Sequence, residues 1–293
     1  MLYTRVLTAL IALVGLVGAA WLAPPNVFDL LLLLLVCFAC AEWLGLLGVS
    51  RAGALLLGLI LFLAGAAGLL WLPAIQAAAI GSGAAVLPLY GLTAFFWLLL
   101  VPYALHQRRP VFGSAIVARL AALILALTTW IALIQADGLG KGFLLSVLLI
   151  IWVADTAAYF AGKAFGRRKL APEISPGKTW EGVIGAVVAN LVLTVVLATN
   201  GSVSSENPVG TFFFWMRLEM GLPMLGLIVV LLTLVSVMGD LYESLLKRTA
   251  GVKDSGRLLP GHGGVLDRLD ALLAVVPVTM GLVSLIQLGT LSR

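Results

Sequence analysis

Long apolar runs separated by short polar breaks follow one another along the whole chain. A helix needs about 20 mostly apolar residues to cross the hydrocarbon core of a bilayer, and runs of this length recur throughout. The pattern predicts an all-α polytopic integral membrane protein with about nine transmembrane helices. The predicted spans are Val6–Leu22, Phe28–Leu47, Gly53–Leu72, Val86–Leu105, Ile116–Gln135, Phe143–Lys163, Trp180–Ala198, Leu222–Leu246 and Asp267–Leu288.

The polar breaks predict the orientation of these spans, because cytoplasmic loops carry an excess of Lys and Arg. With the N-terminus in the cytoplasm, 15 of the 18 basic residues fall in cytoplasmic loops; the exceptions are Lys141, Arg217 and Arg293. We therefore expect a cytoplasmic N-terminus and a C-terminus on the opposite side. The first run could instead be a signal peptide ending near Ala19 and Ala20, but further apolar runs follow, and we interpret it as a retained span.

Composition agrees with this class, since 62% of the 293 residues are hydrophobic and only 11% are charged. A soluble domain carries about 25% charged residues. The two cysteines, Cys37 and Cys40, lie in one apolar run, where we interpret them as core residues; without paired histidines they do not make a four-ligand zinc site. Near the ends of other spans, Trp43 and Trp97 are interpreted as interfacial anchors, and Glu42 as a lone polar residue rather than a catalytic one.

The charges gather in the second half of the chain. Of the 31 charged residues, eight lie in 155–181 and ten in 240–270. We expect a single transmembrane domain, 1–293, in which residues 1–142 are mainly scaffold and 143–293 carry the active site. Both clusters fall on the predicted cytoplasmic side.

The cluster at 240–270 begins at the end of an apolar run, where a carboxylate is costly and is usually kept for function. On a continuing helix, Asp240, Ser244 and Lys247 share one face. After a glycine-rich stretch that suits phosphate binding, Asp267 and Asp270 open the last span. Two aspartates on separate helices, Asp240 and Asp267, could hold a hard cation such as Mg²⁺. The alternative is an ordinary basic cytoplasmic loop with acids that balance it.

The stretch from Ser244 to Asp270 closely resembles the signature of the phosphatidate cytidylyltransferase (CDP-diacylglycerol synthase) family. It reads Ser-x-Leu-Lys-Arg, then Lys-Asp, then Leu-Pro-Gly-His-Gly-Gly-Val-x-Asp-Arg-Leu-Asp. The chain length, hydrophobicity and C-terminal position of the motif are similar to those of the bacterial members, so the resemblance extends to the whole chain.

The resemblance implies transfer of the cytidylyl group of CTP to phosphatidic acid, which yields CDP-diacylglycerol and pyrophosphate. It implies metal binding by Asp240 and Asp267, a Mg²⁺ ion with a possible K⁺ beside it, a homodimer, and a bacterial inner membrane with the active site on the cytoplasmic side. It gives no role to nucleic acid. We expect catalytic roles for Ser244, Lys247, Arg248, Lys253, Asp254 and His262, and substrate contacts from Gly263, Gly264 and Arg268.

The cluster at 155–181 is expected to face the same site. Asp155 lies within an apolar run and is either a substrate-binding acid or a helix-packing aspartate. Lys178 is the preferred phosphate contact. The sequence Gly177-Lys178-Thr179 is not the end of a P-loop, because that motif needs glycine at position 172, where this chain has Pro172.

The expected mechanism is direct attack of the phosphatidate oxygen on the α-phosphorus of CTP, driven by positioning and charge neutralisation. Two alternatives remain. A CTP-dependent lipid kinase would release CDP instead of pyrophosphate, and a secondary transporter would place its site at the midplane between repeats. Charge at one membrane face, without a visible repeat, disfavours transport.

Overall fold

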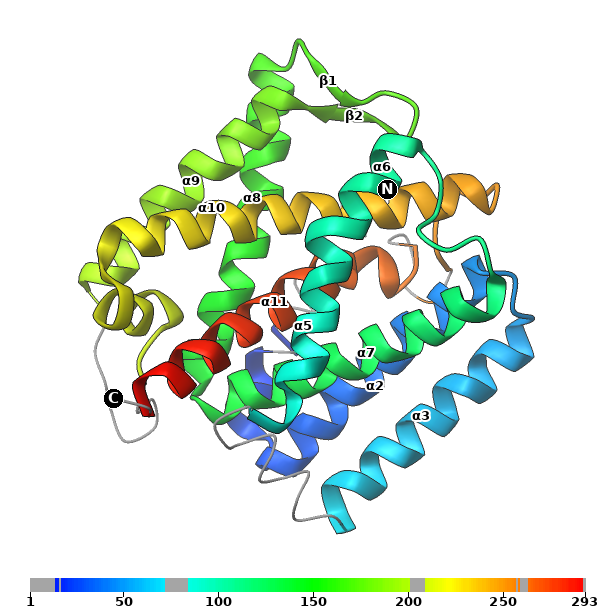
Figure 1. The fold of residues 1–293 in the computed structure, drawn as a ribbon, viewed down its shortest axis with the longest axis horizontal. Helices are drawn as coiled ribbons and strands as arrows, with labels where there is room; N and C mark the ends of the chain where they lie inside the picture. Colours follow the sequence, from blue (N-terminus) through cyan, green and yellow to red (C-terminus); the bar gives the residue numbers. More distant parts are fainter. Residues whose placement is uncertain are drawn as a thin grey trace.

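The computed structural model describes residues 14–15, 17–71, 84–200, 209–256, 258 and 263–291. These residues form a bundle of helices with one two-stranded hairpin (Figure 1). The helices are α2 (Pro25–Leu46), α3 (Arg51–Trp71), η1 (Ala84–Val86), α5 (Leu87–Phe95), η2 (Phe96–Leu100), α6 (Val101–Gln107), α7 (Ala115–Gly138), α8 (Lys141–Phe165), α9 (Trp180–Thr199), α10 (Phe212–Thr249) and α11 (Leu266–Leu291). The strands are β1 (Lys169–Ala171) and β2 (Ser175–Thr179).

Eight helical segments of the described part are long and apolar enough to cross a membrane, which confirms the polytopic all-α class. They correspond to the second to ninth predicted spans. The helix that matches the fourth predicted span is continuous from Leu87 to Gln107. It contains a π-helical turn, η2, between α5 and α6. The first predicted span, Val6–Leu22, lies largely outside the described residues.

Helix α10 is longer than predicted, because residues 212–220 are helical too. Gly221 interrupts it with a positive φ of 77°, a conformation that glycine adopts without steric cost, and Pro223 follows. The short segment before this kink is docked into the bundle by Phe212, whose N–H donates to Ser146 Oγ of α8 at 2.8 Å. The predicted start at Leu222 is therefore the start of the straight part of the helix.

The hairpin joins α8 to α9 and was not predicted from the sequence. Its antiparallel strands pair Lys169 with Thr179, and Thr179 then caps α9 by accepting the N–H of Gly182 at 3.2 Å. Arg248, at the end of α10, donates from Nε to the carbonyl of Ile174 at 3.3 Å. The hairpin is thus held against the end of α10.

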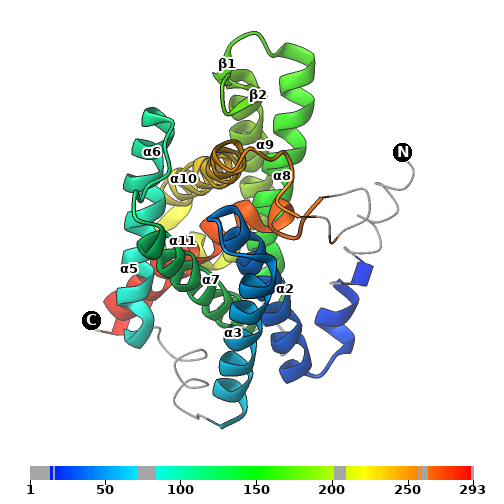
Figure 2. The same ribbon diagram turned by 90° about the vertical axis from the view of Figure 1, so that its right-hand side faces the viewer.

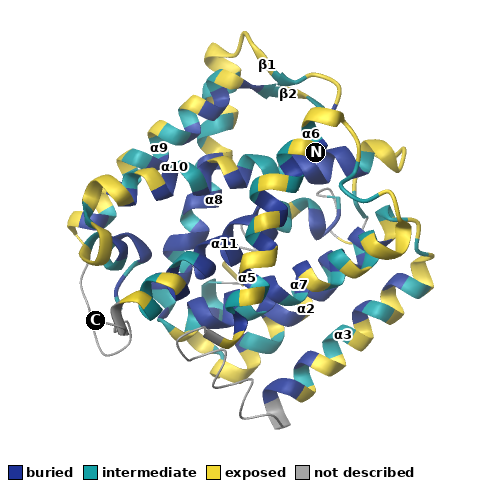
Figure 3. Ribbon diagram, in the orientation of Figure 1, coloured by how far each residue is buried: buried dark blue, intermediate teal, exposed yellow. Residues whose placement is uncertain are grey.

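Helix α11 crosses the centre of the bundle and is the most buried of the eight spans found in the described residues (Figures 1, 2 and 3). Helices α3 and α9 lie at the edges and expose apolar side chains, as expected of faces in contact with lipid. Inside the bundle, Asn190 of α9 donates to the carbonyl of Ile150 at 3.0 Å and to Thr233 Oγ1 at 2.9 Å. This amide joins α8, α9 and α10, the helices around the charged clusters.

Candidate active site

Three carboxylates meet where α10 and α11 cross. Asp240 and Glu243 of α10 and Asp270 of α11 each offer an oxygen, and these oxygens lie within 4.8 Å of one another. The close crossing depends on Gly239, where a Cβ would lie 2.8 Å from the Asp270 carbonyl oxygen and 3.0 Å from Ala271 Cα. A glycine at this position lets the two backbones approach and brings the acids together.

The hairpin brings a cation to this carboxylate triad. Lys178 Nζ, on β2, lies 2.6 Å from Asp240 Oδ2, and Ser244 Oγ lies 3.4 Å from Asp240 Oδ1. Asp155 of α8 has Asp240, Lys178 and Arg268 as its electrostatic neighbours. The two charged clusters predicted to face one site are therefore adjacent.

A second group of charges adjoins the triad near the end of α10 and the start of α11. Lys247 Nζ lies 2.5 Å from Glu243 Oε2 and 2.6 Å from Asp267 Oδ1, and all three side chains are largely buried. Asp267 also accepts the backbone N–H groups of Gly264 at 2.7 Å and of Ser255 at 3.1 Å. Lys247 thereby joins the triad to the connecting loop.

The interactions above involve five acidic and three basic side chains. When all of them are ionised, the formal charge of the group is −2. Like charges this close repel one another unless a cation neutralises them. The acids are Asp155, Asp240, Glu243, Asp267 and Asp270, and the bases are Lys178, Lys247 and Arg268.

The triad suits a hard divalent cation. Octahedral Mg²⁺ with oxygens at 2.0–2.1 Å places neighbouring ligands about 2.9 Å apart and opposite ligands about 4.2 Å apart. The observed spread of up to 4.8 Å requires only small side-chain movements to reach this geometry. In addition, Glu243 Oε1 is buried and has no hydrogen-bond partner among the residues that the structure describes. Such an oxygen is costly unless a ligand uses its lone pairs.

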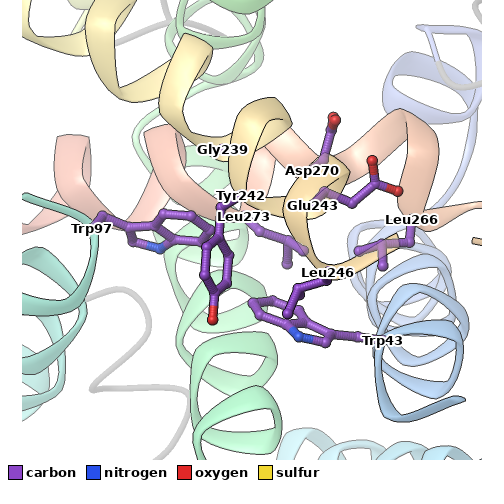
Figure 4. Close-up of a pocket in the computed structure, with 9 residues that line it drawn as sticks. All are labelled: Trp43, Trp97, Gly239, Tyr242, Glu243, Leu246, Leu266, Asp270 and Leu273. Carbon is purple, nitrogen blue, oxygen red and sulfur yellow. The ribbon is translucent and has the colours of Figure 1, made fainter. Parts of the chain in front are cut away.

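Below the triad lies an apolar pocket with an aromatic wall (Figure 4). The Tyr242 ring packs edge-on against Trp97, with centroids 5.9 Å apart, and against Trp43 at 6.3 Å. The interfacial interpretation of these two tryptophans is wrong, since both are buried inside the protein. Both instead pack against Tyr242, which lies two residues after Asp240 on α10. The pocket is lined by Trp43, Trp97, Gly239, Tyr242, Glu243, Leu246, Leu266, Asp270 and Leu273.

The remaining predicted site residues lie around this centre or on its loop. Arg248 contacts the hairpin, whereas Lys253 and Asp254 are exposed on the connecting loop. Gly263 has a positive φ of 81°, and a Cβ there would collide with the Asp267 carboxylate. Gly264 is buried. His262 lies outside the described residues.

The structure groups Asp240 with Glu243 and Asp270, whereas the sequence analysis paired Asp240 with Asp267. The metal assignment itself stays a prediction. One signal in the sequence indicates the triad: Glu243 follows Asp240 by three residues, as Asp270 follows Asp267, and this spacing keeps both acids of each pair on one helix face.

Comparison with known proteins gives consistent similarities. A sequence model described as the cytidylyltransferase family matches residues 3–286. A phosphatidate cytidylyltransferase of Haemophilus influenzae is 47% identical over 141 residues, which cover 47% of this chain and 44% of that protein. One of Pseudomonas aeruginosa is 43% identical over 158 residues, 53% of each chain. One of Staphylococcus epidermidis is 33% identical over 198 residues, 68% of this chain and 70% of the relative. The chain thus matches about half the length of the first two relatives.

Proposed function

This chain belongs to the cytidylyltransferase family, and we propose that it transfers the cytidylyl group of CTP to phosphatidic acid, forming CDP-diacylglycerol and pyrophosphate. The relatives that it resembles bear the name phosphatidate cytidylyltransferase. The observation that carries the proposal is the carboxylate triad at the α10–α11 crossing, with Lys178 beside it. Reactions of nucleoside triphosphates need such a pairing of a cation site with basic side chains.

We propose that Asp240, Glu243 and Asp270 hold a divalent cation, Mg²⁺. When bound, this ion would neutralise charge on the reacting phosphates. The sequence also predicts Asp267 as a ligand, and its place beside Lys247 keeps it next to the triad. A K⁺ ion in addition to Mg²⁺ is implied by the family resemblance alone.

The basic side chains have distinct parts in the proposal. Lys178 would leave Asp240 for a phosphate of CTP when the carboxylate receives another cation. Lys247, held between Glu243 and Asp267, is fixed in place and would stabilise the negative charge that develops on the pyrophosphate. Arg268 would contact the phosphate of the lipid. Because that phosphate is already an anion, the attack needs positioning more than a strong general base.

We further propose that the protein lies in the bacterial inner membrane with this site on the cytoplasmic side, where CTP is present. The excess of Lys and Arg in one set of loops supports this orientation. The acyl chains of phosphatidic acid would stay in the bilayer while its head group reaches the site. The family resemblance also implies a homodimer.

The first experiment uses purified protein in detergent with phosphatidic acid, Mg²⁺ and CTP labelled on the α-phosphate. Label should enter the lipid phase with an equal amount of pyrophosphate. Asp240→Asn should lower turnover by about a thousandfold while the protein stays folded, because it removes a charged ligand. Release of CDP without lipid label would indicate a lipid kinase.

Asp267→Asn distinguishes the two metal assignments. We expect it to abolish most turnover as well, and close to full activity would contradict any role for Asp267 at the metal. Mn²⁺ binding, measured by electron paramagnetic resonance, should weaken strongly in Asp240→Asn. Equal weakening of Mn²⁺ binding in Asp267→Asn would make Asp267 a metal ligand. Nearly unchanged Mn²⁺ binding would mean that Asp267 contacts only Lys247 and the α10–α11 loop.

A further inference from the structure

One carboxylate from the N-terminal spans reaches the loop between α10 and α11. Glu42, in the last turn of α2, accepts the Ser255 hydroxyl at 3.0 Å and the Leu266 N–H at 2.8 Å, both through Oε2. Its side chain also lies against Gly256 and Gly264, where a Cβ would collide with the carboxylate. Glu42 is therefore seated in a close-fitting site made by the loop.

The bond to Leu266 places Glu42 at the N-terminus of α11. The first N–H groups of a helix have no partner within the helix and carry partial positive charge. Capping side chains usually come from the residue just before the helix. Here Glu42 takes that part for Leu266, from a residue 224 positions away in the sequence. The helix that it caps carries Asp267, Asp270 and Arg268.

The same carboxylate closes the loop. Ser255 lies near the start of the connection and Leu266 at its end, so Glu42 joins the two. Asp267 of α11 also contacts both ends of the connection, because it accepts the N–H groups of Ser255 and Gly264. The described residues at the two ends of the connection, Ser255 on one side and Gly264 and Leu266 on the other, are thus held to the same two carboxylates.

We propose that Glu42 is a positioning residue of the active site, which holds the α10–α11 loop and the start of α11 in the geometry that nucleotide transfer needs. The expected effect on turnover rests on the proposed function, whereas the expected effect on the loop does not. Glu42 contacts Ser255 and Leu266 and acts through these two residues. A misplacement of about 1 Å at a reacting group costs about a hundredfold in rate.

Two substitutions separate positioning from simple stability. Glu42→Ala removes both hydrogen bonds and should lower kcat about a hundredfold in protein that remains folded. Glu42→Gln keeps an acceptor oxygen of the same reach and should retain kcat within about threefold, since a neutral acceptor can still cap. Glu219→Ala, at an exposed position near the other end of α10, is the matched control and should match the wild type.

A double-mutant cycle tests whether the effect passes through the loop. If Glu42 acts through Ser255, then Ser255→Ala in the Glu42→Ala background should add almost nothing to the loss. A purely structural role predicts something else: a lower thermal midpoint and less folded protein, with the kcat of the folded fraction unchanged.

Amide hydrogen exchange followed by mass spectrometry provides a readout that does not depend on activity. In Glu42→Ala, peptides covering 252–268 should exchange faster, while those from α9 should not; Glu42→Gln should stay close to wild type. Unchanged exchange together with unchanged kcat in Glu42→Ala would overturn the inference. A wild-type protein without nucleotidyl transfer would instead refute the proposed function. Amide exchange would still show whether Glu42 holds the α10–α11 loop.

Discussion

The spans before residue 139 and those after it meet the same lipid but use their polar groups differently. In α2–α7, polar contacts mostly join one helix to another: the Tyr90 hydroxyl donates to Gln135 inside the bundle, and Lys141 pairs with Asp137 at 2.6 Å where α7 meets α8. In α8–α11, by contrast, three acids gather at the crossing of α10 and α11, with Lys178 beside them. Polar groups of the first kind stabilise a fold, and those of the second kind are suited to binding a ligand.

The division has exceptions, and they are informative. Glu42, Trp43 and Trp97 belong to the first set of spans, yet they touch the loop or the aromatic wall of the site. Each of them contacts α10, α11 or the loop between them, and none is a member of the triad. The first set of spans thus fixes the orientation of the helices that carry the acids.

Among the substitutions that compare the two sets of spans, the largest effect should come from Lys178→Met. This change keeps the length of the side chain but removes its charge. Turnover should fall about a hundredfold, the usual effect of removing one stabilising donor. Mn²⁺ affinity without CTP should rise severalfold, because the ammonium group no longer competes for Asp240. Mn²⁺ titration and the labelled-CTP assay measure the two effects.

Lys169→Met, at an exposed position on strand β1, is the control for this variant and should leave both quantities unchanged. Weaker Mn²⁺ binding in Lys178→Met would show that Lys178 supports the cation site instead of competing with it.

An intermediate effect is expected from Gly239→Ala, which should force the α10 and α11 backbones apart. We expect a loss of about 1–3 kcal/mol in the free energy of unfolding, as in other overpacked sites, with weaker Mn²⁺ binding. Gly226→Ala on the same helix is the control, since a Cβ there would meet only Leu191 Cδ2 at 3.8 Å. Equal stabilities of the two variants in a denaturant titration would contradict the close crossing.

The smallest effect should come from Tyr90→Phe in the first set of spans. Loss of its hydrogen bond to Gln135 should cost about 1 kcal/mol of unfolding free energy, with kcat unchanged. A large loss of turnover at unchanged stability would remove the distinction between the two sets of spans. Denaturant titration and the labelled-CTP assay on the same preparation decide between these outcomes.

The sequence predicted the spans well because hydrocarbon imposes length and hydrophobicity on each of them separately. It also predicted that Asp155, Lys178 and Asp240 face one site, because both charged clusters fall on the same side of the membrane. It missed the hairpin, whose three- and five-residue strands carry no alternating apolar pattern. It could not predict the role of Glu42, because a single acid near a span end looks the same whether it meets water or a helix N-terminus 224 residues later.

That long separation has a consequence for synthesis of the protein. A ribosome adds about 5–20 residues per second, so Glu42 is synthesised roughly 11 to 45 seconds before Leu266. During this interval the carboxylate has neither of the two loop donors that it later binds. A chain that stalls before its last helix therefore cannot form the contacts that join α2 to the start of α11.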